Sequence, residues 1–283
     1  MGGDLGARPR RVIGRDLLPE RRYRETPRDS GTEAHGRLTH GEWVDRFPGL
    51  ECGITTASAG DYGLGRNDHR HVVDVYGSLG SRLGFDLVAV GRQVHGRDVH
   101  VIRADHASTL PPEDARSTPP RLLIVGELDG LVTGERGVLL ASTAADCVPV
   151  YLVDPVGDTI GLVHAGWRGT ALGVLRRGVR AMCGAGAVES LHVHLGPAIC
   201  GSCYEVDAPV LEAFDLEGER AHLDLRGLLT EQARQLGVPT QQISASAWCT
   251  RCSDGLLHSH RGGGRSAGRM VAYIGFRPAT MGD

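Results

Sequence analysis

The sequence predicts a single domain of mixed α-helices and β-strands. Short apolar runs of strand length alternate along the chain with amphipathic stretches of helical length. The 283 residues, 41% of them hydrophobic, suffice for one large domain or two small ones, and no internal repeat or interior linker divides them. We therefore expect one domain over residues 41–283. Residues 1–40 are rich in Arg, Pro and Gly without an apolar period, which predicts a disordered extension.

The first half of the domain is predicted to be mainly strands. Order is expected to begin near residues 43–47. Apolar runs then flank the loop GRQVHGRD and continue to a hairpin, TAADCVPVYLVDPVGDTIGLVHAGWRG, whose two strands are separated by a Pro and a Gly turn. The predicted strands cover residues 87–90, 99–102, 122–125, 138–141, 148–153 and 159–163.

The second half is predicted to alternate between helices and strands. After the hairpin, GWRGTALGVLRRGVRAMC has helical spacing, with one face formed by Leu172, Leu175, Val179 and Met182. Asp207 followed by Ala-Pro is typical of an N-cap with proline in the first turn, so a helix should begin there. The other predicted elements are a helix over 225–236 and strands over 191–195, 243–247 and 271–276.

Composition limits the possible functions. A net charge of −3 gives no case for a nucleic-acid or membrane partner, and no apolar window reaches the roughly 18–20 residues of a membrane span. The sequence contains no lysine, which excludes Schiff-base, pyridoxal-phosphate and P-loop lysines. We expect a cytoplasmic monomer, in which the seven cysteines are thiols or metal ligands rather than disulfides.

Three residues at predicted strand-to-loop junctions form the first candidate site. His95 in QVHG, Cys147 in ADC and His164 in VHAGWRG offer one thiolate and two imidazoles, which suit Zn²⁺ or copper. Three protein ligands leave a fourth position open for water or substrate. Sequence spacing alone does not show that they converge. Cys147 could instead be a buried core thiol, or the nucleophile of a Cys–His hydrolase pair.

Other patterns give rival metal sites. The two CxxC pairs, Cys200/Cys203 and Cys249/Cys252, suggest a structural zinc ribbon with an unusually long gap, or else thiols without metal. Alternating histidines on a strand would face one side and could bind a metal; they occur at His69/His71, His192/His194 and His258/His260. We expect His192 and His194 to be structural. A blue-copper centre needs a cysteine with close histidines and a nearby methionine, and the sequence has no such cluster.

A glycine-rich stretch near the end of the chain is a candidate anion site. In RGGGRSAGR, glycines separate Arg261, Arg265 and Arg269, so that backbone amides and guanidiniums could approach an anion closely. The stretch lacks the spacing and the following helix of a dinucleotide-binding fingerprint. A flexible, exposed loop is the alternative.

These motifs together resemble a known family. QVHG, LDGLVT, TAADCVPVYLVD, VHAGWRGT, GPAIC, CYEV, WCT and SHR followed by GRM occur in this order over residues 53–276. The set resembles the YfiH family, the "multicopper polyphenol oxidase (laccase)" superfamily now regarded as purine nucleoside phosphorylases. The resemblance implies an α+β fold, a four-layer α/β/β/α sandwich of mixed sheets, in a single domain.

The resemblance also implies a site and an activity. Its metal ligands fall on His95, Cys147 and His164, with zinc as the expected cofactor and copper as the second choice. The implied catalytic residues are Cys147, His164 and Arg168, and Arg168, Arg261 and Arg269 are the candidates for holding phosphate. The implied activity is phosphorolysis of adenosine, inosine, guanosine or methylthioadenosine together with deamination of adenosine.

The chain departs from the family pattern at two places. Val75-Tyr76 stands where the family has an Asn-Arg pair, and Gly262 stands where it has a second arginine. Both changes remove groups that could hold an anion. Three other functions are kept as alternatives: a copper-dependent polyphenol oxidase, as the older family name implies; a Cys-dependent hydrolase that uses Cys147 without metal; and a non-catalytic binder of metal or nucleoside, to which these losses could lead.

Overall fold

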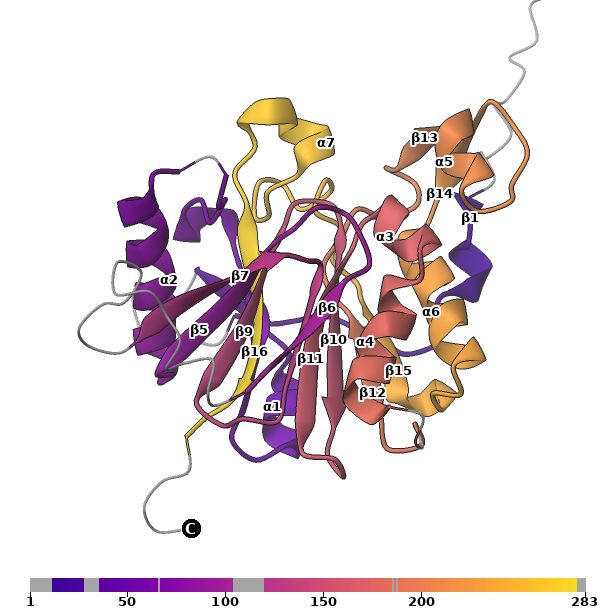
Figure 1. The fold of residues 1–283 in the computed structure, drawn as a ribbon. Coiled ribbons are helices and arrows are strands. Elements are labelled where there is room, and N and C mark those ends of the chain that lie inside the picture. Colours follow the sequence, from indigo (N-terminus) through magenta and orange to yellow (C-terminus); the bar gives the residue numbers. More distant parts are fainter. Residues whose placement is uncertain are drawn as a thin grey trace, which may run out of the picture.

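Four layers of secondary structure form the domain. The computed structural model describes residues 12–27, 36–65, 67–103, 120–184, 186 and 188–278. A helix covers a six-stranded sheet, this sheet packs on a seven-stranded sheet, and further helices cover the far face (Figure 1). The order of layers is α/β/β/α with mixed sheets, as predicted. No helix in the described ranges is long and apolar enough to cross a membrane.

The six-stranded sheet has the order β3-β4-β16-β9-β5-β7. Its pairings are antiparallel from β3 to β9 and parallel from β9 through β5 to β7. The strands are β3 (Arg37–Thr39), β4 (Leu50–Thr55), β16 (Met270–Phe276), β9 (Val138–Ala144), β5 (Leu87–Arg92) and β7 (Arg121–Glu127).

The seven-stranded sheet has the order β2-β15-β12-β10-β11-β8-β6 and contains the predicted hairpin at its centre. Strands β10, β11, β12 and β8 pair antiparallel, and the outer pairs are parallel. The strands are β2 (Arg22–Tyr23), β15 (Ile243–Ser246), β12 (His192–Leu195), β10 (Val148–Asp154), β11 (Thr159–Ala165), β8 (Gly130–Thr133) and β6 (Val99–Ile102).

Burial of both sheet faces explains the continuous apolar runs of the sequence. In β10, Tyr151 and Val153 face the core between the sheets, whereas Val150 and Leu152 pack in the core beneath the helices. A strand covered on both faces needs apolar side chains at odd and even positions alike. Every strand predicted from such a run is therefore present, with ends that differ by at most three residues.

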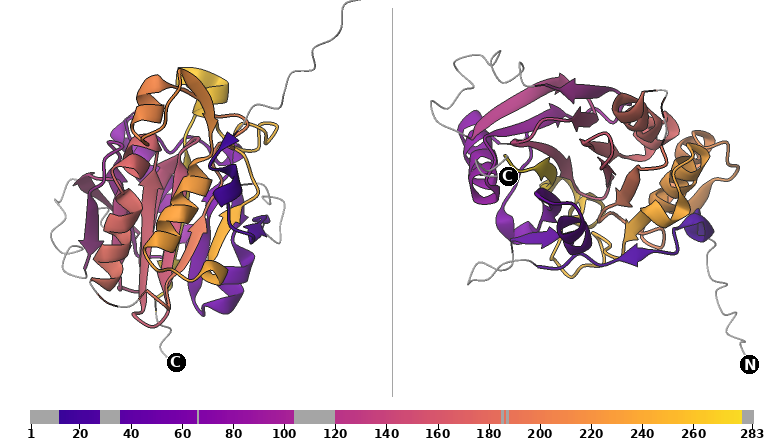
Figure 2. Two further views of the ribbon diagram at one scale, coloured as in Figure 1. Left: turned by 90° about the vertical axis from the view of Figure 1, so that its right-hand side faces the viewer. Right: turned by 90° about the horizontal axis from the view of Figure 1, so that it is seen from below.

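Helices α3 (Trp167–Ala171), α4 (Val174–Cys183) and α6 (Leu225–Gln235) lie over the seven-stranded sheet, and Figure 2 shows α4 and α6 side by side. The single helix predicted after the hairpin is interrupted by Gly173, whose φ of 76° is left-handed. Leu172 is consequently 51% exposed and does not belong to the apolar face. That part of the prediction is wrong, while Leu175 and Val179 are buried as predicted.

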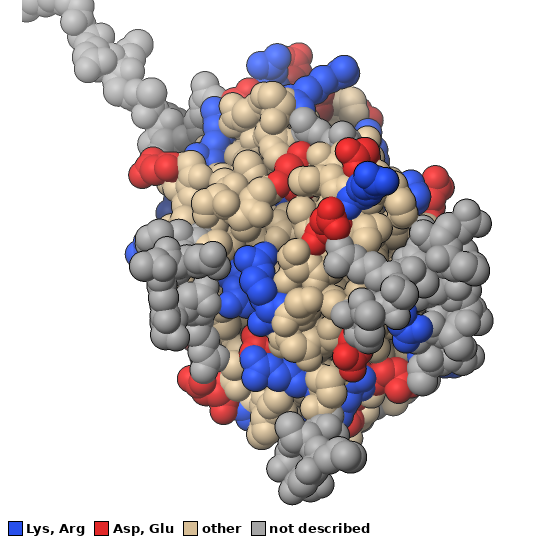
Figure 3. All heavy atoms as spheres, turned by 90° about the vertical axis from the view of Figure 1, so that its left-hand side faces the viewer, with Lys and Arg blue, Asp and Glu red and all other residues tan. Residues whose placement is uncertain are grey.

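Helix α2 (His69–Leu83) covers the outer face of the six-stranded sheet, on the opposite side of the sandwich from these helices. This helix was not predicted from the sequence. Asp68 caps it by accepting a hydrogen bond from the His71 backbone N–H at 2.8 Å. His69 and His71 thus lie in the first helical turn, and their placement on a strand is wrong. On the surface that carries α2, acidic and basic side chains are interspersed, with neither sign dominating its described part (Figure 3).

Short elements complete the fold. A three-stranded sheet, ordered β1-β14-β13, lies beside the helical layer (Figure 1). The remaining bounds are β1 (Val12–Ile13), β14 (Arg220–Leu223), β13 (Glu205–Asp207), α1 (Gly41–Arg46), α5 (Ala208–Glu212), α7 (His260–Gly263), and the 3₁₀ turns η1 (Arg15–Leu17), η2 (Ala57–Ala59), η4 (Thr240–Gln242) and η5 (Gly264–Ser266).

The predicted disordered extension over residues 1–40 is wrong for residues 12–27 and 36–40. Strand β1 pairs with β14, β2 pairs with β15, and β3 is the edge strand of the six-stranded sheet. Residues 1–11 and 28–35 lie outside the described residues. These strands are too short to show a period. The partners of β1 and β2 lie far along the chain, whereas β3 pairs with the nearby β4.

A buried polar cluster holds the segment 12–27 in place. The Glu25 side chain is buried, and its Oε1 lies 2.7 Å from His194 Nε2. Ser246 donates to the other oxygen at 2.7 Å, and His194 Nδ1 lies 2.9 Å from Ser244 Oγ. Burial raises the pKa of Glu25 to about 7 and lowers that of His194 to about 3. The structural role predicted for His194 is therefore supported by its contacts.

Replacing Glu25 with alanine should lower the free energy of unfolding by about 2–4 kcal/mol. The change leaves the His194 and Ser246 side chains without their buried partner, and each such group costs about 1–3 kcal/mol. Denaturant titration of Glu25→Ala against Glu20→Ala, a change at an exposed residue of the same segment, measures the effect. Equal stability of the two variants would show that the segment does not pack on the domain in solution.

Candidate active site

The three candidate ligands meet at one end of the central hairpin. Cys147 directly precedes β10, and His164 lies in β11 opposite Pro149. His95 lies in the loop after β5, with a left-handed φ of 59°. The thiol and the two imidazoles place their ligand atoms within 4.8 Å of one another. The convergence that spacing alone could not show is thus present in the fold.

Asp129 orients this trio, a role that was not predicted from the sequence. Its Oδ1 lies 2.8 Å from His164 Nδ1, which leaves Nε2 of that ring as the nitrogen available for a ligand. The same carboxylate accepts hydrogen bonds from the backbone N–H groups of His95 at 3.0 Å and Gly96 at 2.6 Å. One buried carboxylate therefore positions two of the three candidate ligands. A carboxylate behind a histidine in this way is typical of metal sites.

Close packing explains the glycines of HAGWRG. A Cβ on Gly166 would lie 3.0 Å from Cys147 Sγ and 3.0 Å from His95 Cδ2. A Cβ on Gly169 would lie 2.8 Å from the Gly96 carbonyl oxygen. Glycine at both positions lets the start of α3 approach the thiol and the His95 loop directly.

The electrostatics of the trio favour a charged sulfur. Burial acts to raise the pKa of the Cys147 thiol, but the neighbouring His164, together with hydrogen bonds from His164 and His95, lowers it to about 6. Burial also acts to lower the pKa of His164, but the neighbouring Cys147 and Asp129 raise this pKa to about 9. Each group thus stabilises the charge of the other. The thiolate is also the form of cysteine that binds metals or acts as a nucleophile.

The donor set fits a zinc ion. One thiolate and two imidazole nitrogens are ligands that zinc accepts, and a three-residue set leaves a position open. Asp129 fixes the His164 ring from behind, as a metal ligand of this kind requires. In the described ranges, a second group could also hold a metal, formed by Cys200, Cys203, Cys249 and Cys252. None of the three His-x-His pairs is part of either group.

The trio opens into a cavity of about 600 Å³, within the size range of small-molecule sites. All three predicted arginines line this cavity, and their guanidiniums are held in different ways. The Cζ atom of the Arg168 guanidinium lies 4.2 Å from the centre of the Trp167 ring. Arg261 lies over Tyr204 and donates to the Glu205 carbonyl at 2.7 Å, whereas Arg269 donates to the carbonyls of residues 267 and 268.

Asp146 links two walls of the cavity and was not recognised in the sequence. Its Oδ2 accepts the backbone N–H of Arg261 at 2.6 Å, and its Oδ1 accepts the Thr250 hydroxyl at 2.6 Å. Its φ of 92° is left-handed, which few residues adopt without such anchoring. The ADC motif places Asp146 beside the thiol, but its partners Thr250 and Arg261 lie about 100 residues later, so the motif does not reveal this role.

Further lining residues were also missed. Arg92, Gln93 and Tyr204 face the cavity, and Gln93 exchanges hydrogen bonds with the Thr143 backbone at 2.7 and 3.1 Å. The family departures lie elsewhere. Val75 and Tyr76 belong to α2, where Tyr76 is buried in the apolar core and Val75 packs partly buried against it. Neither they nor Gly262 line the cavity.

Comparison with known proteins gives a consistent match. Residues 52–277 match the family described as "Multi-copper polyphenol oxidoreductase laccase". YlmD of Geobacillus stearothermophilus, named a purine nucleoside phosphorylase, is 34% identical over 275 residues, covering 87% of this chain and 96% of that protein. RL5, from an unknown prokaryotic organism and named an adenosine deaminase, is 32% identical over 225 residues, covering 74% of this chain and 83% of RL5.

Solved structures share the fold. The crystal structure of the same YlmD superposes with a TM-score of 0.71 at 32% identity, covering 88% of this chain and 98% of that one. The crystal structure of the hypothetical protein YfiH of Bacillus licheniformis gives a TM-score of 0.72 at 27% identity, covering 87% of this chain and 98% of that one.

Proposed function

The chain belongs to the multi-copper polyphenol oxidoreductase laccase family, as its motifs predict, and we propose that it is a zinc-dependent purine nucleoside phosphorylase that also deaminates adenosine. The observation that carries the proposal is the convergence of His95, Cys147 and His164 on a cavity lined by arginines. Adenosine, inosine, guanosine and methylthioadenosine are the proposed nucleosides, with phosphate as co-substrate.

The trio would hold the zinc ion. His164 would bind through Nε2, because Asp129 occupies Nδ1, and Cys147 would bind as the thiolate. When bound, zinc supplies Lewis acidity, which polarises a substrate group and lowers the pKa of water. The left-handed backbone at His95 and the glycine at position 166 keep the three ligand side chains in reach of one point.

The arginines would hold the phosphate. Phosphorolysis breaks the bond between the ribose C1′ and the purine nitrogen, and forms a bond from C1′ to a phosphate oxygen. Positive charge develops at C1′, so a phosphate held beside it stabilises the transition state as well as attacking. Arg168, Arg261 and Arg269 all face the same cavity as the trio and can bind an oxyanion through paired N–H groups.

Deamination is proposed as a second activity of the same cavity. It replaces the exocyclic amino group of adenosine by oxygen from water and releases ammonia, and it needs no phosphate. The name of RL5 supports it. The two activities therefore place different demands on the arginines, which allows them to be separated.

The proposal is tested by incubating the protein with adenosine and inosine, with and without phosphate, and separating free base from deaminated nucleoside. We expect hypoxanthine from inosine only when phosphate is present, and inosine from adenosine in both conditions. Product formation that persists after metal removal would instead favour a Cys147-dependent hydrolase. Oxygen uptake with a phenol and bound copper would favour a polyphenol oxidase. Metal binding without any product would indicate a non-catalytic binder.

Replacing Asp129 with asparagine should weaken zinc binding about 10–100-fold, the usual effect of removing a carboxylate behind a histidine ligand. The amide cannot match the charge that holds the His164 ring and the backbone N–H groups of residues 94–96. Competition with a chromogenic chelator measures the affinity. Asp98→Asn, a change at a nearby exposed acid, is the control. Unchanged affinity in Asp129→Asn would contradict the proposed ligand set.

A further inference from the structure

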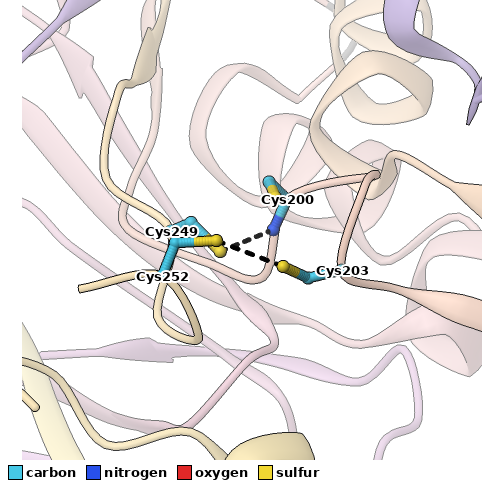
Figure 4. Close-up of side chains that lie close together, drawn as sticks. All are labelled: Cys200, Cys203, Cys249 and Cys252. Carbon is cyan, nitrogen blue, oxygen red and sulfur yellow. Dashed lines mark hydrogen bonds between the residues drawn. The ribbon is translucent and has the colours of Figure 1, made fainter. Parts of the chain in front are cut away.

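Four cysteine side chains from two separate loops gather in a second group. Cys200 and Cys203 lie between β12 and β13, and Cys249 and Cys252 lie in the loop after β15 (Figure 4). The two pairs are far apart in sequence, yet all four sulfurs lie within 4.8 Å of one another. We propose that these four thiols bind a second Zn²⁺ ion, as a structural site distinct from the trio of His95, Cys147 and His164.

The distances suit a tetrahedral site. Four sulfurs about 2.3 Å from a zinc ion lie about 3.8 Å apart, so mutual distances within 4.8 Å need only a small inward adjustment. The Sγ atoms of Cys203 and Cys252 are 3.2 Å apart, so these two sulfurs would instead move slightly outward to bind the ion. A four-cysteine set with x₂ spacing in each pair is typical of structural zinc, because it fills every position of the ion.

The surrounding backbone is arranged for charged sulfur. The backbone N–H of Cys200 donates to Cys249 Sγ at 3.3 Å, an interaction that stabilises a thiolate ligand. Cys203 N–H donates to the Cys200 carbonyl at 2.9 Å, which closes the first CxxC turn. The two loops are joined by Thr250 N–H, which donates to the Ala198 carbonyl at 3.2 Å, and by Arg251, which donates to the Cys203 carbonyl at 3.2 Å.

The same two loops support the catalytic side. The backbone N–H of Ile199 donates to the Asp146 carbonyl at 3.0 Å, and the Thr250 hydroxyl donates to the Asp146 carboxylate. Asp146 is the residue before Cys147, and Ile199 and Tyr204 line the cavity. An ion that fixes these loops therefore holds the residue that directs the Cys147 thiol. This positioning role rests on the proposed function, whereas binding of the ion does not.

Metal analysis of the purified protein is the first test. We expect two zinc ions per chain in the wild type and one in Cys252→Ser or Cys203→Ser, with the remaining ion lost when Cys147→Ser is added. Cys183→Ser, a change outside both groups, should keep both ions. Wild-type zinc content that is unchanged in both Cys252→Ser and Cys203→Ser would overturn the second site.

Cobalt substitution tests the ligands themselves. In the Cys147→Ser background, apo-protein titrated with Co²⁺ should show thiolate-to-cobalt charge-transfer absorption that saturates at one equivalent and disappears in Cys252→Ser. Because Cys147 is absent, this signal is independent of the trio and of any enzymatic activity. Intact mass that shows the loss of two hydrogens for each cysteine pair would identify disulfides and overturn the proposal. Iron found in place of zinc would overturn the choice of ion.

The positioning role has its own readout. Cys252→Ser should lower the melting temperature, because the two loops lose the ion that joins them. It should also reduce kcat while changing KM little, because the loops that hold Asp146 loosen while the arginines remain in the cavity. Cys252 is exposed, so its replacement should not prevent folding. Zinc loss without any change in melting temperature or kcat would overturn the positioning role.

Discussion

Replacing Cys147 with serine is expected to remove the metal from the trio and to abolish both proposed activities. Serine offers a neutral hydroxyl where zinc binding requires a thiolate, and only two imidazoles then remain. The loss of phosphorolysis and deamination should exceed roughly 100-fold, beyond the effect of changing a group behind a ligand. Zinc analysis and product assays on one preparation measure both effects.

The fold should survive this change. Cys147 precedes β10 at the end of the sandwich, and the three apolar cores do not include it. The melting temperature of Cys147→Ser should therefore remain close to that of Cys183→Ser, the control thiol. Stoichiometric zinc at the trio in the inactive Cys147→Ser variant would contradict the ligand assignment and favour a nucleophilic cysteine. Unfolding of the variant would instead show that the ion at the trio is structural.

The strands were predictable because burial leaves a direct trace in the sequence. The hairpin strands are covered on both faces, and their runs are apolar throughout. Helix α2 left a weaker trace. Its buried residues Val72, Tyr76, Leu79 and Leu83 have helical spacing, but the glycines among them are poor helix formers. Gly80 is needed there because a Cβ would lie 2.8 Å from Val88, a contact that only the tertiary structure reveals.

The segment 12–27 shows the limit of local patterns most clearly. Its strands have two residues each, so neither a period nor a propensity can identify them. Their order comes from pairing with β14 and β15, more than 200 residues later, and from Glu25 in the polar cluster. A polar, arginine-rich composition is compatible with folding when the rest of the domain supplies the partners.

The candidate site was partly predictable for a similar reason. The residue types of the trio and their places at strand ends were visible in the sequence, and so were the arginines. The roles of Asp129 and Asp146 were not, because each depends on which groups from distant loops surround one carboxylate. Neither residue has a neighbour in sequence that reveals those partners.

Arg261 provides the test that separates the two proposed activities. Its guanidinium faces the cavity from the start of α7, 5.0 Å from the Tyr204 ring centre. Its backbone N–H, which binds Asp146, is kept in any substitution. The side chain can therefore be removed while the link between α7 and the Cys147 loop remains.

Changing Arg261 to alanine should slow phosphorolysis much more than deamination. Loss of a paired, charge-assisted contact to an oxyanion costs about 2–4 kcal/mol at the transition state, which corresponds to roughly 30–1000-fold in kcat/KM. Deamination uses no phosphate, so its rate should change little. Inosine cleavage over a range of phosphate concentrations, and adenosine deamination without phosphate, measure the two effects in the same variant.

Arg265→Ala is the matched control, because Arg265 is an exposed arginine of the same glycine-rich stretch that does not line the cavity. It should leave both activities unchanged. Arg261→Lys should give an intermediate loss, because lysine keeps the charge but cannot bind an oxyanion through two parallel N–H groups. A fall in deamination as large as that in phosphorolysis would show that Arg261 shapes the cavity in general. Unchanged phosphorolysis would leave phosphate binding to Arg168 and Arg269, whose side chains face the same space.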